Sequence, residues 1–154
     1  LGYPLEAGEA NPAPSNFVAR LNSQAATDFT GVTTALKSNA ATVVDARSAP
    51  RFRGEEAEPR PGVAPGHIPG SLNLHYAKLV DAGRLASPES VRKLFEDAGA
   101  DLSKPIVTTC GSGVTAALLA FALARAGKDD VAVYDGSWAE WGSRPDAPIA
   151  TGSR

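Results

Sequence analysis

Apolar and polar positions follow two different periods along the chain, and these periods alternate. Short runs rich in β-branched residues predict four strands, at residues 42–45, 71–74, 105–109 and 131–134. Apolar positions near helical spacing, with capping residues beside them, predict helices at residues 27–39, 88–98 and 113–126. Because strands and helices alternate, we expect an α/β fold with a central parallel sheet of about five strands and helices on both faces.

Two segments rich in proline and glycine interrupt this pattern. Residues 1–22 open with Pro4, Pro12 and Pro14, which disfavour helix, so we predict an inter-domain linker or a wrapping arm there. Residues 46–70 hold further prolines among interleaved arginines and glutamates, and we predict one long loop there, of the kind that is either functional or disordered. The globular domain is expected to occupy residues 23–154.

Composition and charge exclude several classes of partner. A length of 154 residues suits one globular domain. Lys and Arg number 15 against 17 Asp and Glu, so the net charge of −2 leaves no basic excess to neutralise a nucleic-acid backbone. The longest apolar stretch, at residues 114–126, falls short of the roughly 20 residues that a membrane-spanning helix needs. Neither nucleic acid nor a membrane is an expected partner.

The few cysteines and histidines narrow the chemistry further. Cys110 is the single cysteine and cannot form an internal disulfide. With only His67 and His75 beside it, a zinc site of cysteines and histidines cannot be assembled, and we expect no metal. The opening residues lack an initiator Met, a basic region and an apolar region, so we expect a cut or processed start rather than a signal peptide.

Cys110 lies where a predicted buried strand stops and a predicted helix begins. In open parallel sheets, ligands bind at this edge. Gly111 and Gly113 can adopt positive φ and direct backbone N–H groups at a sulfur near the positive end of the following helix. That environment lowers the pKa of a thiol and favours a nucleophilic thiolate, whereas the alternative is a small buried hydrophobic side chain. A lone reactive thiol also favours a reducing, cytoplasmic location.

Two other chemistries use a similar spacing. Gly111-Ser-Gly113-Val-Thr-Ala116 fits a dinucleotide-binding fingerprint, and Asp135 ends the next strand where a ribose-binding acid would lie. Only one short unit follows Asp135, so the dinucleotide site remains a less favoured alternative. A cysteine phosphatase needs an arginine six residues after its nucleophile, and that position is Ala116. Phosphatase chemistry is therefore disfavoured.

Several motifs together resemble one known family. The loop Cys110-Gly-Ser-Gly-Val-Thr115 comes first, and supporting motifs run along most of the chain: Val-Val-Asp45-Ala-Arg47, Arg51-Phe-Arg-Gly54, Glu58-Pro-Arg60, Gly66-His-Ile-Pro-Gly70 and the segment from Val131 to Trp141. They resemble the rhodanese-type sulfurtransferases, in the form typical of 3-mercaptopyruvate sulfurtransferases. The opening Gly-Tyr-Pro-Leu-Glu is similar to the connector between the two domains of such enzymes. Residues 23–154 therefore resemble a C-terminal, catalytic rhodanese-like domain.

The resemblance implies a role for each loop residue. Cys110 would attack the sulfur of 3-mercaptopyruvate, release pyruvate and hold the sulfur as a persulfide. Ser112 corresponds to a catalytic loop serine that acts with an aspartate and a histidine of the other domain. Arg51 and Arg60 would bind the substrate carboxylate and carbonyl, for which guanidinium forks are suited. The remaining substrate-binding loop residues would be Gly111, Gly113, Val114 and Thr115, and no cofactor is implied.

Other residues are expected to have structural roles. Asp45 and Arg47 are interpreted as a buried polar pair that fixes loops. His67, in a turn that shapes the fold, is expected to be hydrogen-bonded rather than catalytic, and His75 matches no motif and has no assigned role. Trp138 and Trp141 are expected to pack in the core and at its rim.

The resemblance also implies donor, acceptor and partners. The neutral residues after the cysteine favour the monoanionic 3-mercaptopyruvate over the dianion thiosulfate. The acceptor would be cyanide or a thiol, and a companion N-terminal rhodanese domain is an expected partner. Two alternatives remain: a thiosulfate sulfurtransferase with the same persulfide, and a rhodanese-fold binding or regulatory module with little turnover.

Overall fold

A five-stranded parallel sheet forms the centre of the computed structural model, which describes residues 2, 4–5 and 7–153. Its strands are β1 (Ala26–Thr27), β2 (Thr42–Asp45), β3 (Leu72–Asn73), β6 (Ile106–Thr109) and β7 (Val131–Tyr134). They lie in the order β1-β7-β6-β2-β3, and every neighbouring pair is parallel. The predicted α/β architecture is confirmed. The strand order makes β6 the central strand, so its carboxyl end lies midway along the edge of the sheet that is formed by the carboxyl ends of the strands.

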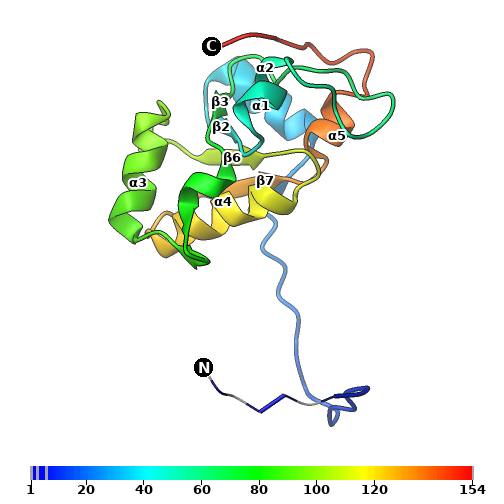
Figure 1. Ribbon diagram of the computed structural model, residues 1–154, viewed down its shortest axis with the longest axis vertical. Helices are drawn as coiled ribbons and strands as arrows, with labels where there is room; N and C mark the ends of the chain where they lie inside the picture. The colour runs from blue at the N-terminus through cyan, green and yellow to red at the C-terminus, as the bar shows by residue number, and fades with distance from the viewer. Residues whose placement is uncertain (1, 3, 6, 154) are drawn as a thin grey trace.

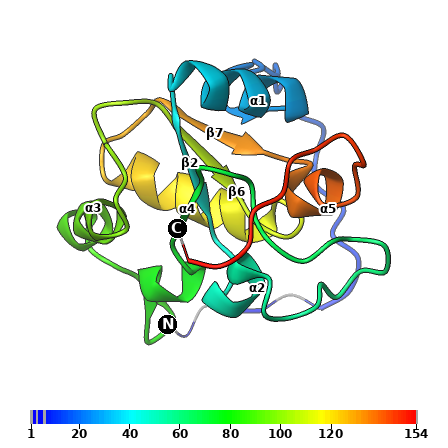
Figure 2. The same ribbon diagram turned by 90° about the horizontal axis from the view of Figure 1, so that it is seen from above.

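Helices cover both faces of this sheet (Figures 1 and 2). The longer helices are α1 (Phe29–Ser38), α3 (Pro88–Asp97) and α4 (Val114–Arg125), and α5 (Ser137–Trp141) is a short one. Of the two capping residues that the sequence offers for the first helix, Thr27 and Asp28, Asp28 caps α1, because its carboxylate accepts the N–H of Gly31 at 2.8 Å. Ser87 likewise begins α3, where it accepts the N–H of Ser90. Local capping signals therefore define where these helices begin.

The structure corrects the prediction of one long loop over residues 46–70. A short helix, α2 (Ala49–Arg53), lies inside that segment. Pro50 falls in its first turn, where proline is tolerated, and Gly54 ends it at a φ of 77°. Between β3 and α3 the chain also forms a 3₁₀ turn, η1 (Tyr76–Leu79), and a hairpin of β4 (Val80–Asp81) and β5 (Arg84–Leu85).

The two sheet faces bury two separate apolar clusters. One cluster packs residues of α3, α4 and η1 against the sheet, and it includes Ile106. The other packs Val107 with Val32 of α1 and with Trp138 and Trp141 of α5. Ile106 and Val107 are neighbours in β6, and they enter opposite clusters because successive strand side chains point to opposite faces. Both tryptophans are buried, which confirms their predicted packing role in the core.

The described residues before β1 extend away from the domain as an arm (Figure 1). Their large apolar side chains are among the most exposed of the structure, with Leu5 at 98% and Leu21 at 94%. No helix among the described residues is long and apolar enough to cross a membrane.

Candidate active site

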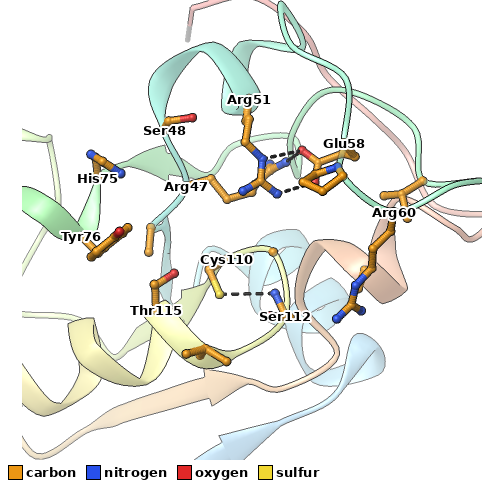
Figure 3. A pocket seen from close by; sticks show the side chains of 16 residues that line it. Arg47, Ser48, Arg51, Glu58, Arg60, His75, Tyr76, Cys110, Ser112 and Thr115 are labelled. Carbon is orange, nitrogen blue, oxygen red and sulfur yellow. Dashed lines mark hydrogen bonds and ion pairs between the residues drawn. The ribbon is translucent and has the colours of Figure 1, made fainter.

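Cys110 lies directly after β6, at the start of a loop that ends where α4 begins (Figure 3). Gly113 precedes α4 at a φ of 85°, a conformation that favours glycine. A Cβ added to Gly113 would lie 3.1 Å from the backbone oxygen and from Oδ1 of Asp135. This close approach explains a glycine at position 113 and places Asp135 against the loop.

Residues at the start of α5 hold the loop in position. The carbonyls of Cys110 and Gly111 accept the N–H groups of Trp138 and Ala139, at 2.9 and 3.0 Å. The N–H of Cys110 donates to Oγ of Ser137 at 3.2 Å, and the same hydroxyl donates to the carbonyl of Tyr134. These bonds direct the first two loop carbonyls toward α5. The N–H of Ser112, which follows in the loop, lies against the sulfur.

The Cys110 sulfur is buried, yet it is surrounded by hydrogen-bond donors. The residue is 2% exposed, and the N–H of Ser112 lies 3.4 Å from Sγ. Burial by itself raises the pKa of the thiol, but the Thr115 hydroxyl and the N–H groups of Ser112, Ala116 and Thr115 lower it, and the net effect is a lowered pKa. Thr115 and Ala116 lie in the first turn of α4, where N–H groups have no partner within the helix. Their donation to sulfur is the arrangement that favours a thiolate.

A cavity of about 480 Å³ lies above Cys110 (Figure 3). Seven of the residues predicted for the site line it: Cys110, Ser112, Arg51, Arg60, Gly111, Val114 and Thr115. Gly113 does not line the cavity, since it is buried against Asp135. Segments separated by about sixty residues in the sequence therefore meet around one sulfur.

Arg51 is held beside the loop by a carboxylate. Its Nη2 and Nε donate to the two oxygens of Glu58, at 2.6 and 3.2 Å, and this bond raises the pKa of Arg51. The guanidinium also lies close to Gly111, where an added Cβ would be 3.1 Å from Nη2. A guanidinium has five N–H groups, and within the described part of the chain the other three of Arg51 make no hydrogen bond, so they can bind a ligand. Arg60, by contrast, is exposed and lies on the Ser112 side of the cavity in Figure 3.

A buried network of ion pairs holds Glu58, the partner of Arg51, in place. Arg47 bonds Asp45 through Nε and Nη2, and its Nη1 lies 2.8 Å from Oε1 of Glu58. Arg47 also donates to the carbonyl of Gly66 and packs over the ring of Trp138. The predicted buried pair of Asp45 and Arg47 is confirmed. Glu58 is shared between Arg47 and Arg51, which links the end of β2 to the cavity.

His67 has the predicted structural role. Its Nδ1 donates to the carbonyl of Phe52 at 2.8 Å, and its ring stacks on that of Phe52. The backbone of His67 also bridges to Ala150.

Five residues of functional interest were not identified from the sequence. Glu58 and Ser137 position Arg51 and the loop, and three further side chains line the cavity: Ser48, His75 and Tyr76. Glu58 opens the motif Glu58-Pro-Arg60, and this motif is the sequence signal that could have identified it. Ser137 likewise lies in the matching segment from Val131 to Trp141. Ser48, His75 and Tyr76 carry no local signal, because their role arises from which strand ends meet at the sheet edge.

Within the described ranges, no group of three or more Cys, His, Asp or Glu side chains is placed to hold a metal ion. The acid of the dinucleotide alternative, Asp135, packs against Gly113, and the loop N–H groups surround the Cys110 sulfur. The arrangement is thus suited to a sulfur nucleophile and an anionic ligand.

Comparison with known proteins gives consistent matches. The Rhodanese-like domain family matches residues 31–144. A 3-mercaptopyruvate sulfurtransferase from Homo sapiens is 45% identical over 152 residues, which cover 97% of this chain and 51% of that protein. A thiosulfate sulfurtransferase from Rattus norvegicus is 39% identical over 155 residues, covering 98% of this chain and 52% of that protein.

A solved structure is similar as well. The crystal structure of a 3-mercaptopyruvate sulfotransferase from Escherichia coli superposes with a TM-score of 0.72 at 39% identity, over 86% of this chain and 49% of that one. The chain spans about half the length of the curated relatives it matches.

Proposed function

The chain belongs to the rhodanese-like domain family, and we propose that it is a sulfurtransferase that moves sulfane sulfur from 3-mercaptopyruvate to a thiophilic acceptor. The observation that carries this proposal is the set of donors around Cys110 at the floor of a cavity lined by Arg51 and Arg60. A stabilised thiolate supplies the nucleophile, and the arginines suit an anionic substrate.

In the first half-reaction the Cys110 thiolate attacks the sulfur of 3-mercaptopyruvate. A bond forms between the two sulfurs, and the bond between carbon and sulfur breaks. The electron pair of that bond passes to the carbon skeleton as the enolate of pyruvate, which takes up a proton from solvent. The sulfur stays on Cys110 as a persulfide, whose charge the loop N–H groups stabilise.

Arg51 and Arg60 would hold the donor during this step. The three free N–H groups of Arg51 can bind the planar carboxylate, while Glu58 keeps the guanidinium in place. Arg60, exposed at the cavity mouth, would contact the carbonyl oxygen on which charge develops.

The loop residues favour 3-mercaptopyruvate over thiosulfate. Gly111, Ser112 and Gly113 carry no charge, so the loop offers a dianion no additional cation next to the sulfur. Thiosulfate remains the second donor to be tested, because a thiosulfate sulfurtransferase is also similar to the chain. Steady-state kinetics with both donors should give the higher kcat/KM for 3-mercaptopyruvate, and an equal or higher value for thiosulfate would contradict this assignment.

A companion N-terminal rhodanese domain would complete the site. Ser112 and Val114 are exposed at the cavity mouth, with Val114 at 75%, and matched relatives are about twice as long as the chain. We assign to that domain the partners of the Ser112 hydroxyl and the cover over the donor.

Intact mass spectrometry tests the proposal directly. The wild-type chain and Cys110→Ser are each measured before and after brief exposure to 3-mercaptopyruvate without an acceptor. We expect the wild type alone to gain about 32 Da, the mass of one sulfur. An equal gain in Cys110→Ser, or no gain in the wild type when the companion domain is supplied, would refute a Cys110 persulfide.

A further inference from the structure

One wall of the cavity has no role in the proposed reaction of the donor. It consists of Ser48, His75 and Tyr76, which we call the His75 wall. Ser48 follows β2, and His75 and Tyr76 follow β3, so parallel strand pairing brings their ends together beside the end of β6. In Figure 3 this wall and Arg60 lie on opposite sides of Cys110.

The polar groups of the His75 wall are not used to stabilise the local structure. Ser48 precedes α2 and His75 precedes η1, yet neither side chain makes a capping hydrogen bond. The Tyr76 ring instead contacts the His75 ring edge-on, with centroids 4.8 Å apart. A hydroxyl, an imidazole and a phenol ring thus line the cavity without a capping function, and they can contact a ligand.

The cavity has room for more than the donor. A cavity of about 480 Å³ falls in the range of about 300–1,000 Å³ that accommodates drug-sized ligands. A three-carbon acid bound at Arg51 and Arg60 fills only part of this volume. The part of the cavity along the His75 wall lies on the other side of the same sulfur. After pyruvate has left, a second molecule can approach the persulfide through this part of the cavity.

The charges around the cavity define the kind of molecule that fits. Arg47, Arg51 and Arg60 line the cavity together with Glu58, which is shared by Arg47 and Arg51, and Arg47 is also paired with Asp45. Three arginines against two carboxylates leave an excess of one positive charge. The cavity therefore favours an anion. On the His75 wall, a ring N–H of His75 and the hydroxyl of Ser48 can donate to a carboxylate, while the Tyr76 ring offers apolar contact to a short carbon chain.

We propose that the His75 wall binds the sulfur acceptor, and that this acceptor is a small thiol bearing a carboxylate. The proposal rests on the proposed function, because it concerns the second half-reaction. The acceptor thiolate attacks the outer sulfur of the Cys110 persulfide, and a new bond forms between these two sulfurs. The bond from that sulfur to Cys110 breaks, its electron pair returns to Cys110 as the thiolate, and the acceptor leaves as a persulfide.

Two acceptors of matched length test the proposal. 3-Mercaptopropionate and 2-mercaptoethanol share the same two-carbon thiol chain, and only the former carries a carboxylate. Each variant is loaded with 3-mercaptopyruvate, the gain of about 32 Da is verified, and the discharge of the loaded fraction by each thiol is followed by mass. The variants are His75→Ala, Ser48→Ala and the control Lys78→Ala, which removes an exposed cation from η1 outside the cavity.

For His75→Ala we expect KM for 3-mercaptopropionate to rise about tenfold, because a hydrogen bond to a charged group is lost. KM for 2-mercaptoethanol should change less than about twofold under the same rule. Ser48→Ala should likewise raise KM for 3-mercaptopropionate more than KM for 2-mercaptoethanol. His75→Gln keeps an N–H donor, so its KM for 3-mercaptopropionate should lie between those of His75→Ala and the wild type. Lys78→Ala should change neither KM.

Failure of this proposal differs from failure of the proposed function. If the wild type gains no sulfur even when the companion domain is supplied, the persulfide mechanism is wrong. If loading occurs but His75→Ala discharges to both thiols as the wild type does, the His75 wall is not the acceptor site. Calorimetric binding of 3-mercaptopropionate to Cys110→Ser, with and without His75→Ala, gives a readout that needs no loading. Equal affinities there would likewise overturn the proposal.

Discussion

The sulfur of Cys110 lies among hydrogen-bond donors that offset the effect of its burial. Burial disfavours the thiolate, whereas the Thr115 hydroxyl and the nearby backbone N–H groups favour it, and the balance lowers the thiol pKa. Among these donors only the Thr115 hydroxyl belongs to a side chain. It is therefore the donor that substitution can remove without moving the backbone.

Thr115→Val should raise the pKa of Cys110. The thiolate forms above this pKa, so at pH 6 to 7 the variant should hold less thiolate and react several-fold more slowly with iodoacetamide. The measurement is the alkylation rate between about pH 5 and 10; the wild-type midpoint should lie below the ordinary value of a cysteine thiol, and the Thr115→Val midpoint should lie above that of the wild type. Thr115→Ser keeps the hydroxyl and serves as the control. A midpoint in Thr115→Val equal to that of the wild type would show that the hydroxyl does not stabilise the thiolate.

Glu58→Gln should impair both donor binding and stability. The amide has one acceptor oxygen, so it cannot hold Arg47 and Arg51 together as the carboxylate does. Misplacement of Arg51 should lower kcat/KM for 3-mercaptopyruvate by about 10- to 100-fold, mainly through KM. Arg47 and Glu58 are both almost fully buried, and breaking such a pair costs about 3–5 kcal/mol, measured by urea unfolding. Glu56→Gln, exposed on the same loop, is the control, and unchanged kinetics in Glu58→Gln would remove Glu58 from the site.

At the level of single residues, the sequence indicated Cys110, the proposed nucleophile, and its loop, but not the groups that position them. Cys110 and Gly113 could be identified because their role follows from a local pattern, a strand followed by glycines and a helix. Glu58 and Ser137 act on residues 7 and 27 positions away. Such contacts depend on tertiary packing, which no local spacing encodes.

At the level of secondary-structure elements, α5 and the Cys110 loop form one unit. The first N–H groups of α5 hold two loop carbonyls, and the hydroxyl of Ser137 accepts the Cys110 N–H. Ser137 itself has a φ of 50°, a left-handed conformation that is uncommon outside glycine and costs about 1–3 kcal/mol. A strained, fully buried serine is therefore part of what positions the loop.

Substitutions at Ser137 should separate the strain from the hydrogen bonds. Ser137→Ala keeps the strain and leaves the buried Cys110 N–H without a partner, which should cost about 1–3 kcal/mol. Ser137→Gly also loses the hydroxyl but relieves the strain, so its stability should fall between those of Ala and wild type. Urea unfolding gives the order, and Ser143→Ala, at an exposed position after α5, is the control. A stability of Ser137→Ala equal to that of the wild type would contradict this role.

The longer elements could be predicted because their caps and periods are local. Asp28 and Ser87 mark helix starts, and the β-branched runs mark β2, β6 and β7. Several short elements were not predicted, among them β1, α2 and the hairpin of β4 and β5. β1 has only two residues, Ala26 and Thr27, and exists through its pairing with β7. α2 has five residues in a proline-rich segment, where composition alone predicts a loop.

At the level of the whole molecule, the chain corresponds to one domain with an arm. The rhodanese-type resemblance of its motifs is confirmed by the family match, and the five-stranded parallel sheet agrees with it. The strand order, which brings Arg51, Arg60 and Cys110 around one cavity, could not be read from the sequence, because pairing of strands distant along the chain is decided by packing.

Removal of residues 1–22 should leave the stability of the domain nearly unchanged. The large apolar side chains among the described residues of the arm are exposed, with Phe17 at 85% and Val18 at 77%, so they contribute little buried surface to the domain. Thermal unfolding of residues 23–154 and of the full chain should give Tm values within about 2 °C. A fall of more than about 4 °C, near 1 kcal/mol for a domain of this size, would show that the arm packs on the domain.

Cys110 is the single cysteine of these 154 residues. Many redox proteins clear a modified cysteine through a second, resolving thiol of the same chain, which forms a disulfide with it. These 154 residues contain no such thiol, so under the proposed mechanism a sulfur on Cys110 would leave only to an acceptor from outside them. Acceptor concentration would then set the residence time of the sulfur, and the domain would hold one sulfur atom until an acceptor arrives.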